Sequence, residues 1–251
     1  MSRAGALLAA RFSFMPNRLG YCGPEENRAM LDYLVDQQSD RGLEQILARF
    51  AGAFPYYSFI AAANGIPDPF DPRVIEAYWI GNELLDHVEL ADLRRHLDER
   101  FSKRFPAKLL QSVIGQVPAG ARPHHNFHVF SMSVRTGHLE LPHTLETMDE
   151  CRISWGRVVA DHSDSLLVER LPLAFAGDDV VLGPPSPRSV LRRFDGKTLL
   201  SDVAPGDVVA VHWGCACYKL APRQLRHLEK YTRHLLSLTN QQRRGAMLLE
   251  R

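Results

Sequence analysis

The chain has 251 residues, of which 45% are hydrophobic and 24% are charged, and its formal net charge is +1. This composition is typical of a globular protein with one or two domains and a sizeable core. The near-neutral charge does not favour nucleic acid or an anionic membrane surface as a partner. The apolar run at the N-terminus is too short for a secretory leader, and no stretch approaches the roughly 20 apolar residues that span a bilayer. We therefore expect a cytoplasmic protein without a membrane segment.

The first part of the chain has the pattern of a mainly helical domain. Apolar residues recur three and four positions apart, and proline or acidic residues stand where helices would begin. The predicted helices cover residues 25–38, 43–54, 57–64, 72–87, 90–105 and 107–117. The alternating run 123–135 instead predicts a strand or an extended edge, and residues 139–148 predict a connector.

From residue 151 the pattern changes to short strands separated by turn signals such as Gly177-Asp178, Asp195-Gly196 and Pro205-Gly206. The predicted strands cover residues 151–160, 165–170, 172–176, 190–194 and 207–212, and a helix follows over 222–238. Short strands at this spacing favour a small closed barrel. We therefore predict an α+β protein: a helical domain over residues 1–148, then a small OB-like antiparallel β-barrel with a C-terminal helix over residues 149–251.

Two segments of the second part form a recognisable pattern. The first, CRISWGRVV, opens at Cys151 and has Gly156 five residues later. The second, PGDVVAVHWGCACYKL, begins with the turn 205–207 and ends a valine-rich strand at His212, followed by Gly214. In this order and spacing, over roughly the last 100 residues, the chain resembles the HypC/HupF family of hydrogenase maturation chaperones. The whole chain looks like an uncharacterised bacterial family fused to such a domain.

The resemblance implies a role in assembling the metal centre of nickel–iron hydrogenases. Cys151 and His212 would hold an iron fragment with cyanide and carbonyl ligands, and the partners would be a hydrogenase maturase and the hydrogenase large-subunit precursor. The chemistry is consistent, because thiolate and imidazole both suit iron. Two protein ligands also suit a carrier better than the closed four-ligand cage of a structural zinc site. The resemblance thus favours an assembly chaperone over an enzyme, and the chain has no nucleotide-binding motif.

The chain departs from the family pattern around the cysteine. In the family the Cys follows the initiator Met, whereas here Glu150 precedes Cys151 and a long helical part stands upstream. Ser154-Trp155 replaces the usual Ile-Pro before Gly156. The residues expected to flank the site are Trp155, Gly156, Trp213 and Gly214. Trp155 and Trp213 are open to two interpretations, as covers of the site or as core.

The helical part offers a second group of candidate residues. Cys22 lies in a glycine-rich turn before a predicted helix, where a helix N-terminus would lower the pKa of its thiol. His124, His125 and His128 lie within five residues and could bring two imidazoles to one metal, with Asn126 orienting a ring. The alternatives are an inert capped turn and an edge strand. Cys215 and Cys217 are expected to be packing residues, because Cys-x-Cys without a second pair is a poor zinc signal.

Two further hypotheses therefore stand beside the carrier. One is a thiol- or metal-dependent enzyme centred on Cys22 and the histidine cluster. The other is a pure adaptor that uses the barrel only for docking. The sequence does not predict the oligomeric state.

Overall fold

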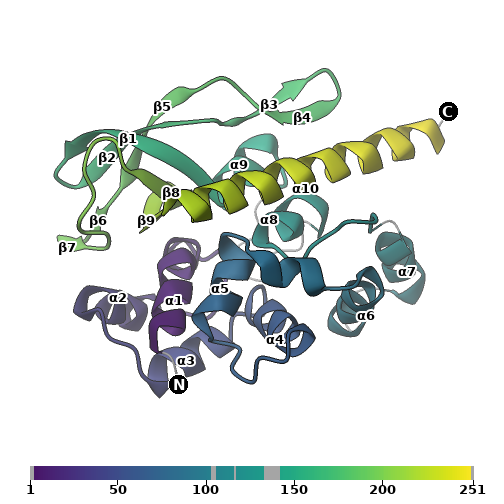
Figure 1. Cartoon of the computed structure of the whole chain (residues 1–251), viewed down its shortest axis with the longest axis horizontal. Coiled ribbons are helices and arrows are strands. Elements are labelled where there is room, and N and C mark those ends of the chain that lie inside the picture. Colours follow the sequence, from purple (N-terminus) through teal and green to yellow (C-terminus); the bar gives the residue numbers. More distant parts are fainter. Residues whose placement is uncertain (1–2, 103–105, 116, 133–141, 250–251) are drawn as a thin grey trace.

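The structure is a computed structural model that describes residues 3–102, 106–115, 117–132 and 142–249. Helices occupy one side of the molecule and strands the other, with the long C-terminal helix between them (Figure 1). The predicted α+β class is therefore confirmed. None of the helices in the described part of the chain combines the length and the apolar character that a membrane span needs.

The helical side is built from short helices whose starts are fixed by local signals. Asp40 accepts hydrogen bonds from the backbone N–H groups of Gly42 and Leu43, and Asp71 caps a helix that begins with Pro72. The elements are α1 (Arg3–Arg18), α2 (Asn27–Asp36), α3 (Arg41–Ala48), α4 (Phe54–Ala63), α5 (Pro72–Trp79), η1 (Glu83–His87), α6 (Leu90–Phe101), α7 (Ala107–Gly115), α8 (His125–Phe127), η2 (His128–Met132) and α9 (Leu145–Cys151).

Five strands pair in a closed order, β1-β2-β5-β9-β8, and β8 pairs back with β1. They are β1 (Ser154–His162), β2 (Ser165–Arg170), β5 (Ser186–Leu191), β8 (Val208–His212) and β9 (Cys215–Lys219). The β5–β9 contact is parallel and consists of Leu191 opposite Cys215, whereas the other four pairings are antiparallel. The predicted antiparallel barrel is therefore found in four of its five pairings, and the fifth pairing is parallel. Two hairpins stand outside the ring, β3 (Leu173–Ala176) with β4 (Asp179–Leu182) and β6 (Arg193–Phe194) with β7 (Lys197–Thr198).

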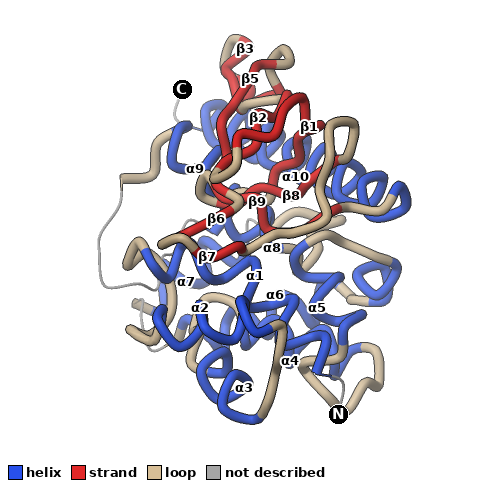
Figure 2. The backbone as a smooth tube through the Cα atoms, turned by 90° about the vertical axis from the view of Figure 1, so that its left-hand side faces the viewer, coloured by secondary structure: helices blue, strands red, loops and turns tan. Residues whose placement is uncertain are grey.

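The helix α10 (Pro222–Leu249) is longer than predicted and lies between the strands and the other helices. Figure 2 shows the same separation from the side, with the strands gathered at one end of the molecule and α1 to α7 at the other. Tyr231 of α10 donates a hydrogen bond to the carbonyl oxygen of Asn82 at 2.9 Å and packs against Gly81, where a Cβ would lie 2.2 Å from the Tyr231 ring. The helix therefore contacts the helical side closely.

One continuous apolar core joins the two sides. It includes Phe12 and Trp79 from the helical side, Trp155 and Ala210 from the strands, and Leu228 from α10. A smaller core inside the barrel contains residues such as Val158, Val168 and Val209. The predicted boundary between residues 148 and 149 falls inside α9. The division into two domains, residues 1–148 and residues 149–251, stays a prediction.

Three local predictions are wrong in ways that matter for the site. Residues 125–132 are not a strand but form α8 and the π-helical turn η2, while residues 133–135 lie outside the described residues. Cys151 does not open a strand but is the last residue of α9, which begins within the predicted connector. The helix α1 was not predicted at all, although its buried face of small and aromatic residues (Ala6, Ala9, Ala10, Phe12) recurs at helical spacing.

Candidate functional site

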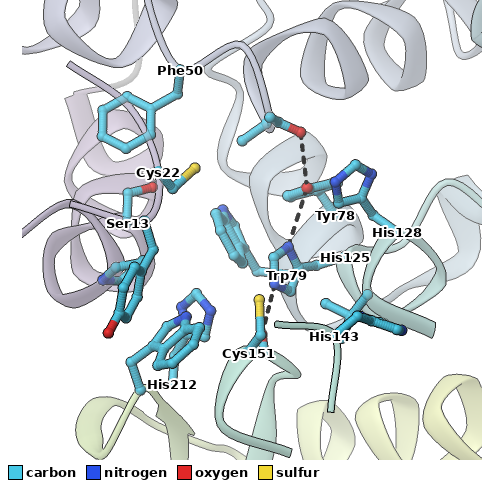
Figure 3. A pocket seen from close by; sticks show the side chains of 16 residues that line it. Ser13, Cys22, Phe50, Tyr78, Trp79, His125, His128, His143, Cys151 and His212 are labelled. Atoms are coloured by element: carbon cyan, nitrogen blue, oxygen red, sulfur yellow. Dashed lines mark hydrogen bonds between the residues drawn. The ribbon is translucent and has the colours of Figure 1, made fainter. Parts of the chain in front are cut away.

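Three side chains from distant segments converge in the interior. His125 comes from α8, Cys151 from the end of α9, and His212 from the end of β8 (Figure 3). One nitrogen of each imidazole and the Cys151 sulfur all lie within 4.8 Å of one another. Donor atoms bound to a single metal at about 2.0–2.3 Å are separated by roughly 3–4.5 Å, so the spacing of these three atoms is close to what one ion requires. The predicted pair Cys151 and His212 is therefore brought together, and His125 joins it.

The amide of Asn126 holds α8 against the start of β1. Its Nδ2 donates to the Ile153 carbonyl oxygen at 3.1 Å and to the Thr232 hydroxyl at 2.9 Å, and its Oδ1 accepts from the Ile153 N–H at 2.8 Å. Asn126 is fully buried. It was expected to orient a histidine ring, but instead it fixes the backbone next to Cys151 and thereby the separation of His125 and Cys151.

Cys151 is placed by the geometry of α9. A capping box of Thr144 and Thr147 starts the helix, and Cys151 ends it. Two residues before Cys151, the buried Asp149 accepts a hydrogen bond from Arg152 Nε at 2.9 Å and forms an ion pair with Arg170 of β2. The Leu173 N–H also donates to Asp149 at 3.0 Å. These contacts tie the end of α9 to β2 and to the start of β3.

His212 is held by a partner from the other end of the chain. Its Nδ1 lies 2.7 Å from the carbonyl oxygen of Phe12 in α1. A carbonyl oxygen only accepts, so Nδ1 carries the hydrogen and Nε2 carries the lone pair. A ligating histidine in metalloproteins is typically held in this way, with its second nitrogen donating to a carbonyl or carboxylate. The Trp79 ring packs against both histidines, with centroids 4.6 Å from His125 and 5.6 Å from His212.

The three donors form part of the wall of a mostly apolar pocket. Its cavity volume is about 50 Å³, several times the roughly 10–15 Å³ that one water molecule requires. Cys22 and His128 also line it, and Figure 3 shows Cys22 on the opposite side from Cys151, beside Ser13 and Phe50. Except for His124, the two groups of residues that the sequence suggested as separate sites therefore meet in one pocket.

The electrostatic environment favours metal ligation over nucleophilic catalysis. Burial, together with the neighbouring His212, lowers the pKa of His125 well below its usual value, so the imidazole is neutral at neutral pH and can donate a lone pair. Cys151 stands at the C-terminus of α9, where the helix dipole disfavours a thiolate. A cation bound at the sulfur would offset this. Cys22 precedes the Glu26 N-cap of α2 by four residues, outside the first turn that would lower a thiol pKa.

The other predicted residues have structural places. His124 is fully buried, accepts a hydrogen bond from the Asn126 N–H at 3.0 Å as the N-cap of α8, and does not line the pocket. Trp155 belongs to the continuous core that joins the helices and the strands. Gly156 packs closely against β2, because a Cβ at this position would lie 2.8 Å from the Val168 side chain. Neither lines the pocket, so of the two interpretations of Trp155 the structure favours core packing.

Trp213 does line the pocket, as expected. It and Gly214 form the turn between β8 and β9, and both have positive φ, +50° and +66°. Type I′ two-residue hairpin turns require this conformation at both positions and normally use Asn-Gly or Gly-Gly. A tryptophan in this conformation is strained. Its indole packs against Tyr21 with a centroid distance of 4.6 Å. Cys215 and Cys217 are buried on β9 in the joint core, and burial raises the pKa of Cys217.

Sequence reasoning missed the residues that hold the donors in place. Phe12 acts through its backbone carbonyl, which has no sequence signal. Tyr78 lies within the predicted helix 72–87, and Asp149 lies between the predicted connector and the first predicted strand. The sequence does contain one signal for Asp149. The capping pair Thr144 and Thr147 marks the start of a short helix, which carries both Asp149 and Cys151.

Comparison with known proteins overturns the resemblance to HypC/HupF. A family profile matches residues 1–246 as one unit, and its description is a family of unknown function (DUF6390); nothing shows a HypC/HupF domain in the chain. No curated protein matches the chain. No solved structure matches it either. The short pattern that carried the resemblance consists of a turn, a valine-rich strand and a terminal histidine, which many small β-structures can share. Because the profile covers nearly the whole chain, this protein belongs to the family of unknown function DUF6390.

Proposed function

We propose that this protein holds one transition-metal ion through His125, Cys151 and His212 and acts as a carrier in the assembly of a metal centre. The observation that carries the proposal is the convergence of one sulfur and two imidazole nitrogens, within 4.8 Å, in the wall of a mostly apolar pocket. Thiolate and imidazole select iron, cobalt, nickel, copper or zinc over magnesium and calcium, which prefer oxygen.

The ligand number supports a carrier more than a structural site. Structural zinc sites use four protein ligands, whereas three leave coordination positions for a ligand that arrives with the metal. The pocket volume of about 50 Å³ accommodates small ligands only. An iron fragment with cyanide and carbonyl ligands fits this limit, because its ligands are diatomic and its iron suits a thiolate. We propose this fragment as the cargo. With it we propose the partners and the compartment expected from the sequence: a hydrogenase maturase, the large-subunit precursor and the cytoplasm.

A metal-dependent enzyme is the second candidate. The specific observation in its favour is that Cys22 and His128 line the same pocket as the three donors. In that case the open coordination positions would bind a substrate of a few atoms, and Cys22 would act on it from the opposite wall. The third hypothesis, a pure adaptor, predicts that the pocket residues are dispensable.

The metal site is tested by measuring the affinity of the purified full-length protein for Zn(II) and Co(II) in competition with a chromophoric chelator. We expect one ion per chain and, with Co(II), a sulfur-to-metal charge-transfer band. Replacing Cys151, His125 or His212 by alanine should weaken binding by more than about 100-fold, since outer-shell changes alone cost 10–100-fold. His124→Asn is the matched control, because asparagine preserves the N-cap of α8. Equal binding by all four variants would refute the site.

The cargo is tested separately by infrared absorption of protein purified from hydrogenase-producing cells. Cyanide and carbonyl stretches that disappear in Cys151→Ala would support the carrier. Metal binding without these stretches would leave the metal site standing and remove the iron fragment. If Cys22→Ala abolished hydrogenase maturation while Cys151→Ala left it intact, the enzyme hypothesis would replace the carrier hypothesis. If deletion of the gene impaired hydrogenase maturation while all these variants restored it, the adaptor would be correct.

A further inference from the structure

His125 has a hydrogen-bond partner at each ring nitrogen. Its Nε2 lies 2.9 Å from the carbonyl oxygen of Cys151, and its Nδ1 lies 3.2 Å from the hydroxyl of Tyr78 (Figure 3). The carbonyl oxygen only accepts, so Nε2 carries the hydrogen and Nδ1 accepts from the Tyr78 hydroxyl. In this tautomer Nε2, the nitrogen on the Cys151 side, has no lone pair for a metal.

Tyr78 has a second acceptor within reach. Its hydroxyl lies 3.4 Å from the carbonyl oxygen of Gly52, on the side away from His125 Nδ1. Tyr78 is buried, and burial raises the pKa of its phenol well above the usual value, so the hydroxyl keeps its one hydrogen. That hydrogen points either to His125 Nδ1 or to the Gly52 carbonyl. When it points to Gly52, the phenol oxygen can accept a hydrogen from Nδ1.

We propose that Tyr78 is the positioning residue that converts His125 into a ligand, which rests on the metal site proposed above. When the metal binds, Nε2 loses its proton to solvent water and bonds the metal, while Nδ1 takes a proton from water and donates it in a hydrogen bond to the Tyr78 oxygen. The Tyr78 hydroxyl then donates to Gly52. The imidazole is neutral before and after, so the proton count of His125 does not change, and the Cys151 thiol supplies the one proton that is released.

The two histidines therefore have different roles. His212 is held permanently in the ligating tautomer, because its Nδ1–H is fixed by the Phe12 carbonyl at 2.7 Å. His125 instead changes its ring tautomer when the metal binds. Its Nε2 loses the hydrogen bond to the Cys151 carbonyl, and its Nδ1 becomes the donor to the Tyr78 hydroxyl oxygen. That carbonyl is at the end of α9, so metal occupancy changes a backbone contact at the junction between α9 and β1.

Tyr78→Phe in the full-length protein tests this role. It removes the acceptor for Nδ1–H with little change in packing, and we expect Zn(II) affinity to fall about 10–100-fold, the usual effect of losing an outer-shell partner. The matched control is Tyr56→Phe. Tyr56 is equally buried, stacks on Tyr78 with centroids 5.4 Å apart, and its hydroxyl lies 3.4 Å from Nδ1 of another pocket histidine, His128. We expect it to bind Zn(II) as the wild type does.

A second measurement does not depend on any variant. Long-range proton–nitrogen NMR of the imidazoles reports which nitrogen carries the hydrogen. We expect His125 to change from Nε2–H to Nδ1–H when Zn(II) is added to the wild type, and His212 to stay Nδ1–H throughout. Retention of Nε2–H on His125 in the loaded protein, or equal losses of affinity in the two tyrosine variants, would overturn the role of Tyr78 alone. Absence of Zn(II) and Co(II) binding by the wild type would overturn the proposed function with it.

Discussion

The Nδ1 atom of His212 lies 2.7 Å from the carbonyl oxygen of Phe12, 200 residues earlier in the chain. The Phe12 ring also stacks on Trp79 at a centroid distance of 5.3 Å, and Trp79 in turn packs against His125 and His212. The first helix thus fixes both the tautomer of one donor and the aromatic surface behind two of them. The candidate site belongs to the whole fold and cannot be assigned to the strands alone.

Asn126→Ala should destabilise the protein by about 2–4 kcal/mol, because it leaves the Ile153 N–H and C=O and the Thr232 hydroxyl without their buried partner. Urea unfolding of the metal-free protein measures this. Gln111→Ala is the control, since Gln111 makes an exposed hydrogen bond to Asp98 and its loss should cost less than about 0.5 kcal/mol. Similar costs for the two variants would contradict the role assigned to Asn126.

Asp149→Ala should cost about 3–5 kcal/mol, because it leaves the buried Arg152 and Arg170 without their shared counter-charge. The exposed pair Arg95–Asp92 provides the comparison, and Arg95→Ala should cost well under about 1 kcal/mol. Both values come from denaturant titrations at the same ionic strength. A small effect of Asp149→Ala would show that the two arginines find other partners or water.

His96 should make stability fall in mild acid. Burial, and secondarily the nearby Arg100, lowers its pKa from the usual 6.5 to about 4, and its ring stacks on Phe59 at 4.5 Å. Between pH 6.5 and 4 the unfolded chain binds a proton at this residue and the folded chain does not. Stability is therefore complete above pH 6.5 and decreases through this window, by about 3 kcal/mol for this group.

His96→Phe keeps the stacking and removes the titration, so its free energy of unfolding should fall less steeply from pH 6.5 to 4 than that of the wild type. Some slope should remain, because burial also lowers the pKa of His124 to about 4. Denaturant unfolding at several pH values makes the comparison. Identical slopes in the two proteins would rule out His96 as a contributor.

Trp213→Asn should speed the release of bound metal to a chelator. Asparagine tolerates the positive φ of this turn position, so the hairpin is preserved. The indole that lines the pocket and packs on Tyr21 is lost. Stopped-flow release of Co(II) from the wild type, from this variant and from Trp155→Phe gives the test, because Trp155 does not line the pocket. Equal rates for all three would exclude Trp213 as a cover.

Sequence alone determined the class of fold and most of the helices, because these depend on local signals such as apolar periodicity, proline at helix starts and turns at Gly177 and Gly206. The pair Cys151 and His212 was predicted from the resemblance to HypC/HupF, and its metal-binding role stays a prediction. Two sequence-based predictions were wrong. A short pattern suggested a HypC/HupF domain that the family profile does not support. The alternating residues around His128 predicted a strand, whereas they form a π-helical turn.

Tertiary structure decided which of the clustered histidines faces the pocket and what fixes each ring. His124, His125 and His128 are near neighbours in the chain, yet His125 meets Cys151 because Asn126 pairs with Ile153. The partners Phe12, Gly52 and Cys151 act through backbone carbonyls, which every residue possesses and no sequence distinguishes. Such contacts arise only when distant segments pack, so the pair of residues was visible in the sequence and the three-donor site was not.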